Sequence, residues 1–136
     1  MSPIARLSRS VCAKTLNATQ SMLSQREHSA CSDIIANVEK GRRFTRGMTY
    51  EAFAADERTV YAGVRCPEII AEASRRLTAE TKGRHPHVPW RVVANAGNAY
   101  RQGYHRVELD MMWFTLTERL DELVAVCRIE LASTPP

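Results

Sequence analysis

The chain has 136 residues, of which 44% are hydrophobic, 25% are charged and 7% are aromatic. This length fits one domain, and the apolar fraction is too high for a chain that is disordered throughout. No apolar run approaches the roughly 18 residues that a membrane-spanning helix needs, so the sequence predicts no membrane span. The formal net charge is +4, which suggests a nucleic-acid partner.

Most of this charge lies near the N-terminus. Residues 1–30 hold four basic residues and one acidic residue, whereas residues 31–136 hold 15 basic and 14 acidic residues. We predict a flexible, basic, Ser/Arg-rich extension over residues 1–20, a helical domain over residues 21–132 and a tail over residues 133–136. The extension is compatible with an organellar transit peptide, a disordered arm or an upstream start codon. It lacks the apolar run of a secretory signal, so we expect a cytoplasmic protein.

The first predicted helix spans about residues 22–44. Its apolar residues recur at helical spacing: Cys31, Ile34, Ile35, Val38 and Phe44. Gly47 then interrupts the chain. Thr49 is suited to cap a short helix that carries Tyr50 and Phe53.

A longer helical segment is predicted from Val60 to Leu77. Pro67 lies inside it, and a proline in a helix interior is expected to kink the helix or divide it. Residues 82–90 have the composition of a loop. Pro89 in this loop suits the first position of the helix that follows.

Two further helices are predicted in the C-terminal half. One runs from Trp90 to about Tyr104, and the other runs from Val107 or Leu109 to about Leu131. No segment alternates between apolar and polar residues as a half-buried strand would. The sequence therefore predicts an all-α fold, an up-and-down bundle of four or five helices.

The four cysteines are far apart in the sequence: Cys12, Cys31, Cys66 and Cys127. Because they form no C-x-x-C pair, they indicate neither a zinc site nor thioredoxin-like chemistry. Cys31 and Cys127 fall on apolar helix faces, so we expect buried free thiols. His85 and His87 have no carboxylate or cysteine beside them, and we predict no metal site and no cofactor.

Small and polar residues interrupt the apolar pattern of the helix after Pro89: Asn95, Gly97, Asn98, Arg101, Gln102 and Tyr104. A glycine in a helix interior costs about 1 kcal/mol relative to alanine. Gly97 therefore indicates either the close approach of another helix or a tolerated substitution. Polar residues gathered on one helix near the end of a bundle can line a binding cleft.

Several short motifs occur in order along the chain. They are Asp33-Ile34-Ile35, Thr49-Tyr50-Glu51-Ala52-Phe53, Ile69-Ile70-Ala71-Glu72-Ala73, His85-Pro86-His87-Val88-Pro89-Trp90-Arg91, and then Asn98, Gly103-Tyr104, Val107 and Trp113. In this ordered set the sequence resembles the HepT-like ribonuclease family, the toxin members of the HEPN superfamily, over about residues 32–131.

The resemblance implies a HEPN-like helical bundle that forms a homodimer and cleaves RNA, such as tRNA, without a metal ion. In that chemistry a ribose 2′-hydroxyl attacks the adjacent phosphate, a histidine moves the proton and an arginine stabilises the developing charge. The resemblance also implies a partner, a small nucleotidyltransferase antitoxin that adds AMP to the motif tyrosine, here Tyr104.

The sequence departs from the family motif at its two principal catalytic positions. Gly97 stands where the family has arginine, and Gln102 stands where it has histidine. Asn98 and Tyr104 are retained, and Glu108 replaces the motif aspartate. Glycine carries no charge and glutamine does not titrate near neutral pH. We therefore predict lost or strongly reduced ribonuclease activity, with dimerisation and binding of RNA, a nucleotide or the nucleotidyltransferase retained.

Two alternatives remain open at this stage. Arg101 and His105 are one helical turn apart and would share a face of a continuous helix, so they could supply an altered active site. The domain could instead be a non-catalytic interaction module that binds through its basic N-terminal arm.

Overall fold

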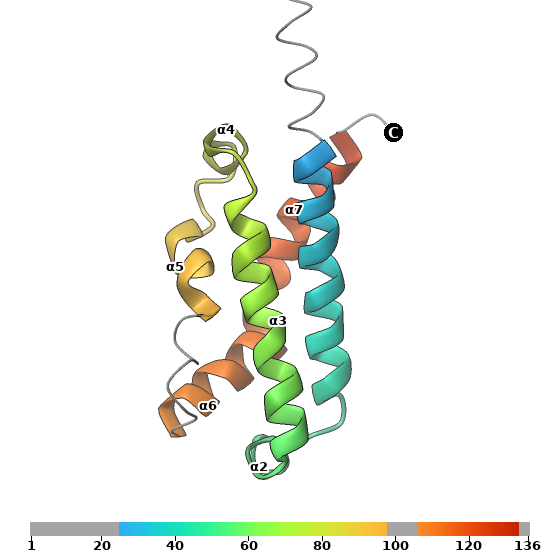
Figure 1. The fold of residues 1–136 in the computed structure, drawn as a ribbon, viewed down its shortest axis with the longest axis vertical. Helices are drawn as coiled ribbons and strands as arrows, with labels where there is room; N and C mark the ends of the chain where they lie inside the picture. The colour runs from blue at the N-terminus through green and yellow to red at the C-terminus, as the bar shows by residue number, and fades with distance from the viewer. Residues whose placement is uncertain (1–24, 98–105, 134–136) are drawn as a thin grey trace, which may run out of the picture.

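The computed structural model describes residues 25–97 and 106–133, which fold into a bundle of helices (Figure 1). The helices are residues 25–45, α2 (Tyr50–Ala55), α3 (Glu57–Arg75), α4 (Ala79–Gly83), α5 (Trp90–Asn95), α6 (Arg106–Phe114) and α7 (Asp121–Ser133), and a π-helix, η2 (Thr115–Arg119), connects the last two. The described residues contain no strand, and the predicted all-α class is confirmed. Within these ranges no helix combines the length and apolarity needed to cross a bilayer. The predicted extension, residues 1–20, lies outside the described residues.

The break between the first helix and α2 follows the sequence prediction. Gly47 has a φ angle of 77°, in the left-handed region that glycine adopts at little cost. Thr49 caps α2, because its side-chain oxygen accepts a hydrogen bond from the backbone N–H of Ala52 at 3.1 Å. Both predictions are confirmed.

The central part of the chain differs from the prediction in two places. Pro67 lies inside α3, which continues to Arg75, so the helix is not divided there. The predicted loop at residues 82–90 begins later than expected, because α4 extends to Gly83. Thr78 caps α4 by accepting a hydrogen bond from the backbone N–H of Thr81 at 3.2 Å.

The C-terminal half also differs in detail. Pro89 is the N-cap of α5, one residue before the helical position that we predicted. The described part of α5 ends at Asn95 and is followed by a 3₁₀ turn at residues 96–97. The last predicted helix was expected to be continuous, but η2 separates α6 from α7.

Two hydrophobic clusters form the core. The larger joins the N-terminal helix, α3 and α7 through Ala30, Cys31, Ile34, Val38, Ile70, Ala73, Leu123, Val124, Val126 and Cys127, among others. The smaller joins α2, α3, α6 and η2 through Phe53, Val60, Val64, Cys66, Met112 and Leu116. On the predicted apolar face of the first helix, Cys31, Ile34 and Val38 are buried and Ile35 is half-buried. Phe44 is exposed, and the Arg43 guanidinium lies 5.9 Å from the centre of its ring.

Leu116 of η2 is held between two glycines on neighbouring helices. A Cβ built on Gly41 would lie 2.7 Å from Leu116 Cδ2, and a Cβ built on Gly63 would lie 2.9 Å from Leu116 Cδ1. Neither position has room for a methyl group while Leu116 stays where it is. The two glycines therefore let the π-helix insert a leucine between the N-terminal helix and α3.

A network of polar side chains links the N-terminal helix, α4 and α7 at the end of the bundle where these helices lie (Figure 1). Glu27 Oε1 accepts hydrogen bonds from the Thr78 hydroxyl at 2.8 Å and the Thr81 hydroxyl at 2.5 Å. Glu130 of α7 accepts two hydrogen bonds from Arg84, at 3.2 and 2.9 Å. These hydrogen bonds lower the pKa values of Glu27 and Glu130, so they stabilise the ionised carboxylates.

Candidate functional site

The structure describes both ends of the segment that the sequence singled out. Gly97 and Glu108 lie within the described ranges. The other candidate residues lie outside them: Asn98, Arg101, Gln102, Tyr104 and His105. The structure therefore gives the geometry of the elements that flank these residues, α5 on one side and α6 on the other.

Gly97 is buried against α3. A Cβ at this position would lie 3.1 Å from Glu68 Cα, 3.3 Å from Glu68 Cγ and 3.6 Å from Glu68 Cβ. The closest of these atoms belongs to the backbone, which cannot rotate away as the end of a side chain can. Of the two interpretations that the sequence left open, the structure supports a close helix approach, because a side chain at 97 would require α3 and its neighbour to separate by a few tenths of an ångström.

Three hydrogen bonds from two side chains hold α5 in this position. Arg75 Nη2 of α3 donates to the backbone carbonyl of Ala94 at 2.5 Å. The indole Nε1 of Trp90 donates to the carbonyls of Lys82 and His85, at 3.1 and 3.0 Å. These contacts hold α5 at both of its ends.

The other flank is anchored by an aromatic contact. Trp113 of α6 packs against Phe53 with ring centroids 5.3 Å apart and against Tyr50 at 6.3 Å. Glu108, one turn into α6, is half-buried, and its Oε2 atom is buried with no hydrogen-bond partner among the described residues. Trp113 thus attaches α6 to α2, and Glu108 brings a carboxylate to the start of α6.

Charge near Gly97 comes from an ion pair on α3. Arg65 Nη1 lies 3.1 Å from Glu68 Oε2, and Glu68 is the residue against which Gly97 packs. The Arg65 side chain is largely exposed. A guanidinium therefore lies close to the site, although its charge is already balanced by a carboxylate.

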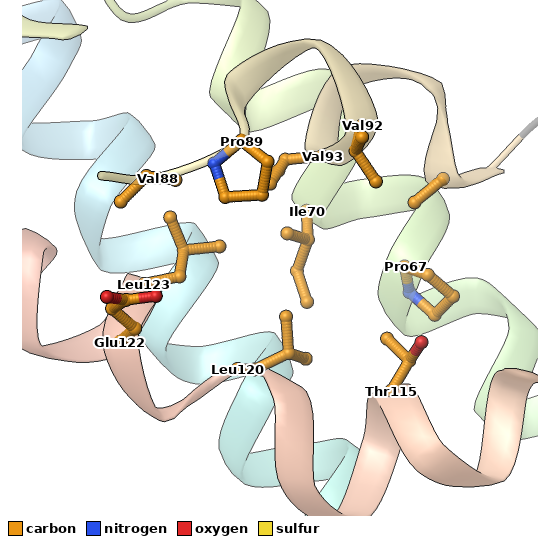
Figure 2. A pocket seen from close by; sticks show the side chains of 11 residues that line it. Pro67, Ile70, Val88, Pro89, Val92, Val93, Thr115, Leu120, Glu122 and Leu123 are labelled. Atoms are coloured by element: carbon orange, nitrogen blue, oxygen red, sulfur yellow. The ribbon is translucent and has the colours of Figure 1, made fainter. Parts of the chain in front are cut away.

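An apolar pocket of about 80 Å³ lies between α3, α5 and the start of α7 (Figure 2). Figure 2 shows Val92 and Val93 of α5 facing Leu120 and Thr115, with Ile70 between them. The lining is completed by Pro67, Val88, Pro89, Ala96, Glu122 and Leu123. Such a pocket can accept a small apolar group, and its position beside Ala96 puts that group next to Gly97.

The two histidines of the loop before α5 each lie near a glutamate, and His85 joins the polar network through Glu130. His85 is 8% exposed, and its Nε2 lies 2.6 Å from Glu130 Oε1. His87 Nε2 lies 3.8 Å from Glu122 Oε1. Among residues 25–97 and 106–133, no three His, Cys, Asp or Glu side chains are grouped in a way that could hold a metal ion.

Sequence reasoning missed Glu68, Arg65 and the apolar pocket. The first two form an (i, i+3) pair on a helix, which by itself is an ordinary surface feature. The pocket is lined by residues of α3, α5, η2 and α7, which come from separate parts of the sequence. Only the adjacent Val92 and Val93 indicated that α5 carries apolar surface on more than one side.

The family model described as ribonuclease HepT-like matches residues 34–129. A Thermococcus cleftensis protein named "Probable ribonuclease HepT" is 34% identical over 91 residues, which are 67% of this chain and 83% of that protein. A Methanocaldococcus jannaschii protein named "Putative RNase MJ0125" is 28% identical over 91 residues, covering 67% and 78% of the two chains. A Caldanaerobacter subterraneus protein also named as an RNase is 32% identical over 78 residues, covering 57% and 70%. No solved structure matches the chain.

Proposed function

Because the chain belongs to the ribonuclease HepT-like family, we propose that it is a degenerate member whose ribonuclease activity is lost or strongly reduced. It keeps the scaffold and binds RNA, a nucleotide or a nucleotidyltransferase partner. The observation that supports this proposal most strongly is the packing of Gly97 against the backbone of Glu68.

Position 97 is where the family motif places its charge-stabilising arginine. A glycine there could be an isolated loss inside an otherwise unchanged site. The 3.1 Å separation between a Cβ at 97 and Glu68 Cα argues against an isolated loss. Instead, α3 packs so closely at this position that its surroundings are fitted to glycine. Loss of one charge-stabilising donor typically lowers a rate by about 10²–10³-fold, and loss of a general acid–base group at Gln102 lowers it by about 10²–10⁴-fold.

Cleavage of purified tRNA and total RNA tests the proposal. The wild-type chain is compared with Gln102→His and with the double variant Gly97→Arg, Gln102→His. A second double variant, Gly97→Ala, Gln102→His, is the matched control, since it adds the same Cβ beside Glu68 without a guanidinium. Thermal melts of every sample show whether the Cβ has disturbed the fold.

We expect no cleavage by the wild-type chain and cleavage only by the variant that carries both the arginine and the histidine. Robust wild-type cleavage that Gln102→Ala abolishes would refute the proposal. Wild-type cleavage that Arg101→Ala or His105→Ala abolishes would instead identify an active ribonuclease with an altered site.

The partner-binding part of the proposal assigns Tyr104 as the acceptor of AMP. Incubation with a cognate nucleotidyltransferase and ATP should add the mass of AMP to the wild-type chain and to Tyr100→Phe, but not to Tyr104→Phe. Tyr100 is a suitable control because it is a tyrosine in the same segment. An unchanged intact mass of the wild-type chain would contradict the assignment.

The proposal also includes a homodimer. Met111 and Phe114 of α6 are each 47% exposed, and apolar side chains of this size on one short helix are suited to an interface. Light scattering should give twice the 15.3 kDa mass of one chain. A monomer at micromolar concentration would exclude the dimer.

A further inference from the structure

Two free cysteines from opposite ends of the domain meet in the core. Cys31 of the N-terminal helix is 2% exposed and Cys127 of α7 is fully buried. Both belong to the same hydrophobic cluster, and the two thiols lie close enough for each to shift the pKa of the other. Figure 1 shows the N-terminal helix lying beside α7.

We propose that Cys31 and Cys127 are a modification site, a thiol pair that a hydroperoxide converts into a disulfide joining the N-terminal helix to α7. The Cys31 thiolate attacks one oxygen of hydrogen peroxide, whose O–O bond breaks. The leaving hydroxide takes up the proton that the thiol gave up, so Cys31 becomes a sulfenic acid and one water is released. Cys127 then attacks the sulfenic sulfur, forming the S–S bond and releasing a second water. Two thiols are oxidised and one peroxide is reduced.

The two cysteines have different roles because their surroundings differ. Cys31 lines a small surface pocket together with Glu27, Thr81 and Glu130. The pocket has a volume of about 10 Å³, which is close to the room that one water-sized molecule needs. Cys127 does not line this pocket, so the peroxide reaches Cys31 first.

The contact between the thiols favours the same order. It lowers the pKa of Cys31, against the opposing effects of burial and of the Glu130 and Glu27 carboxylates. The same contact, together with burial, raises the pKa of Cys127. A thiolate is the reactive form of cysteine, so Cys31 is the residue that attacks the peroxide and Cys127 is the resolving residue.

Cys66 provides an internal comparison. It is as buried as Cys31, but it belongs to the other hydrophobic cluster, where its Sγ lies 3.9 Å from the Ala62 carbonyl. Burial raises the pKa of Cys66. It is therefore a buried thiol that should neither react quickly nor form the disulfide.

The disulfide would close a loop from the first described helix to the last. Cross-links over loops of this length reduce the freedom of the unfolded chain more than that of the folded one. We expect the oxidised chain to melt roughly 10 °C above the reduced chain.

The test treats the purified, reduced full-length chain with hydrogen peroxide, blocks the remaining thiols with N-ethylmaleimide and maps non-reduced peptides by mass spectrometry. Wild type and Cys66→Ser should both yield a peptide linked through Cys31 and Cys127, and dithiothreitol should reverse the link and the rise in melting temperature. Cys127→Ser should instead give a sulfenic acid at Cys31 that dimedone traps.

The peptide map of the wild-type chain tests the proposal by itself, even if a serine variant folds poorly. The proposal is wrong if the wild-type chain yields no linked peptide, or if the link forms only after unfolding in concentrated urea. It is also wrong if the peroxide modifies Cys66 as fast as Cys31.

Discussion

Alanine at position 97 should destabilise the protein, although alanine is the better helix former. The φ angle of Gly97 is not positive, so the backbone itself accepts any residue. The obstacle is Glu68, whose Cα would lie 3.1 Å from the new methyl group. This is about 0.3 Å less than the 3.4 Å at which ordinary contacts begin.

The magnitude follows from two opposing effects. Overpacking of a fitted contact typically costs about 1–3 kcal/mol. Replacing glycine by alanine in a helical conformation returns up to about 1 kcal/mol. We expect Gly97→Ala to lower the free energy of unfolding by about 1 kcal/mol, which corresponds to a fall of roughly 4 °C in melting temperature for a domain of this size.

Urea denaturation followed by circular dichroism measures this change, with Gly83→Ala as the matched control. Gly83 is also a helical glycine, but nothing lies within 4 Å of a Cβ built on it. Gly83→Ala should be neutral or stabilising. Equal or greater stability of Gly97→Ala would refute the close-approach argument and would remove the main support for the degenerate site.

Three further predictions follow from the packing, the polar network and the capping of α2. Leu116→Ala should cost about 2–5 kcal/mol of unfolding free energy, because the side chain is buried between two helices; a loss below 1 kcal/mol in urea titrations would argue against that contact. Hydrogen bonds from Arg84, helped by one from His85, lower the pKa of Glu130 below its ordinary value of 4.5, although burial acts in the opposite direction. The stability that these bonds give is therefore fully present above pH 4.5, and it is lost as the pH falls through the lowered pKa. Glu130→Gln should therefore be less stable at pH 7 by about 2 kcal/mol and lose less stability on acidification; parallel pH profiles for the two proteins would contradict this. Thr49→Ala should cost about 1 kcal/mol through loss of the cap on α2, and an unchanged urea midpoint would show that α2 does not depend on it.

The parts of the fold that follow local rules were predictable. Gly47 and Thr49 act through their own backbone and side chain, and the sequence indicated both. The cap at Thr78 obeys the same rule, but no helix was predicted between Leu77 and the loop at residues 82–90.

Features that depend on tertiary contacts could not be predicted in the same way. Hydrophobic periodicity cannot distinguish a continuous helix from one that contains a single π-turn, so η2 was missed. The motif position of Gly97 was identified from the sequence, and a close helix approach was one of two explanations for it. The choice between them needed the position of Glu68, which is 29 residues earlier in the chain.

The placement of Leu116 between Gly41 and Gly63 has a consequence for how this fold can vary. The side chains at these three positions would occupy the same space, so a methyl group added at either glycine requires a smaller or displaced side chain at position 116. A chain of this fold with alanine at 41 or 63 should carry a smaller residue than leucine at 116. Substitutions at these three sites should therefore be tolerated in combination more readily than singly.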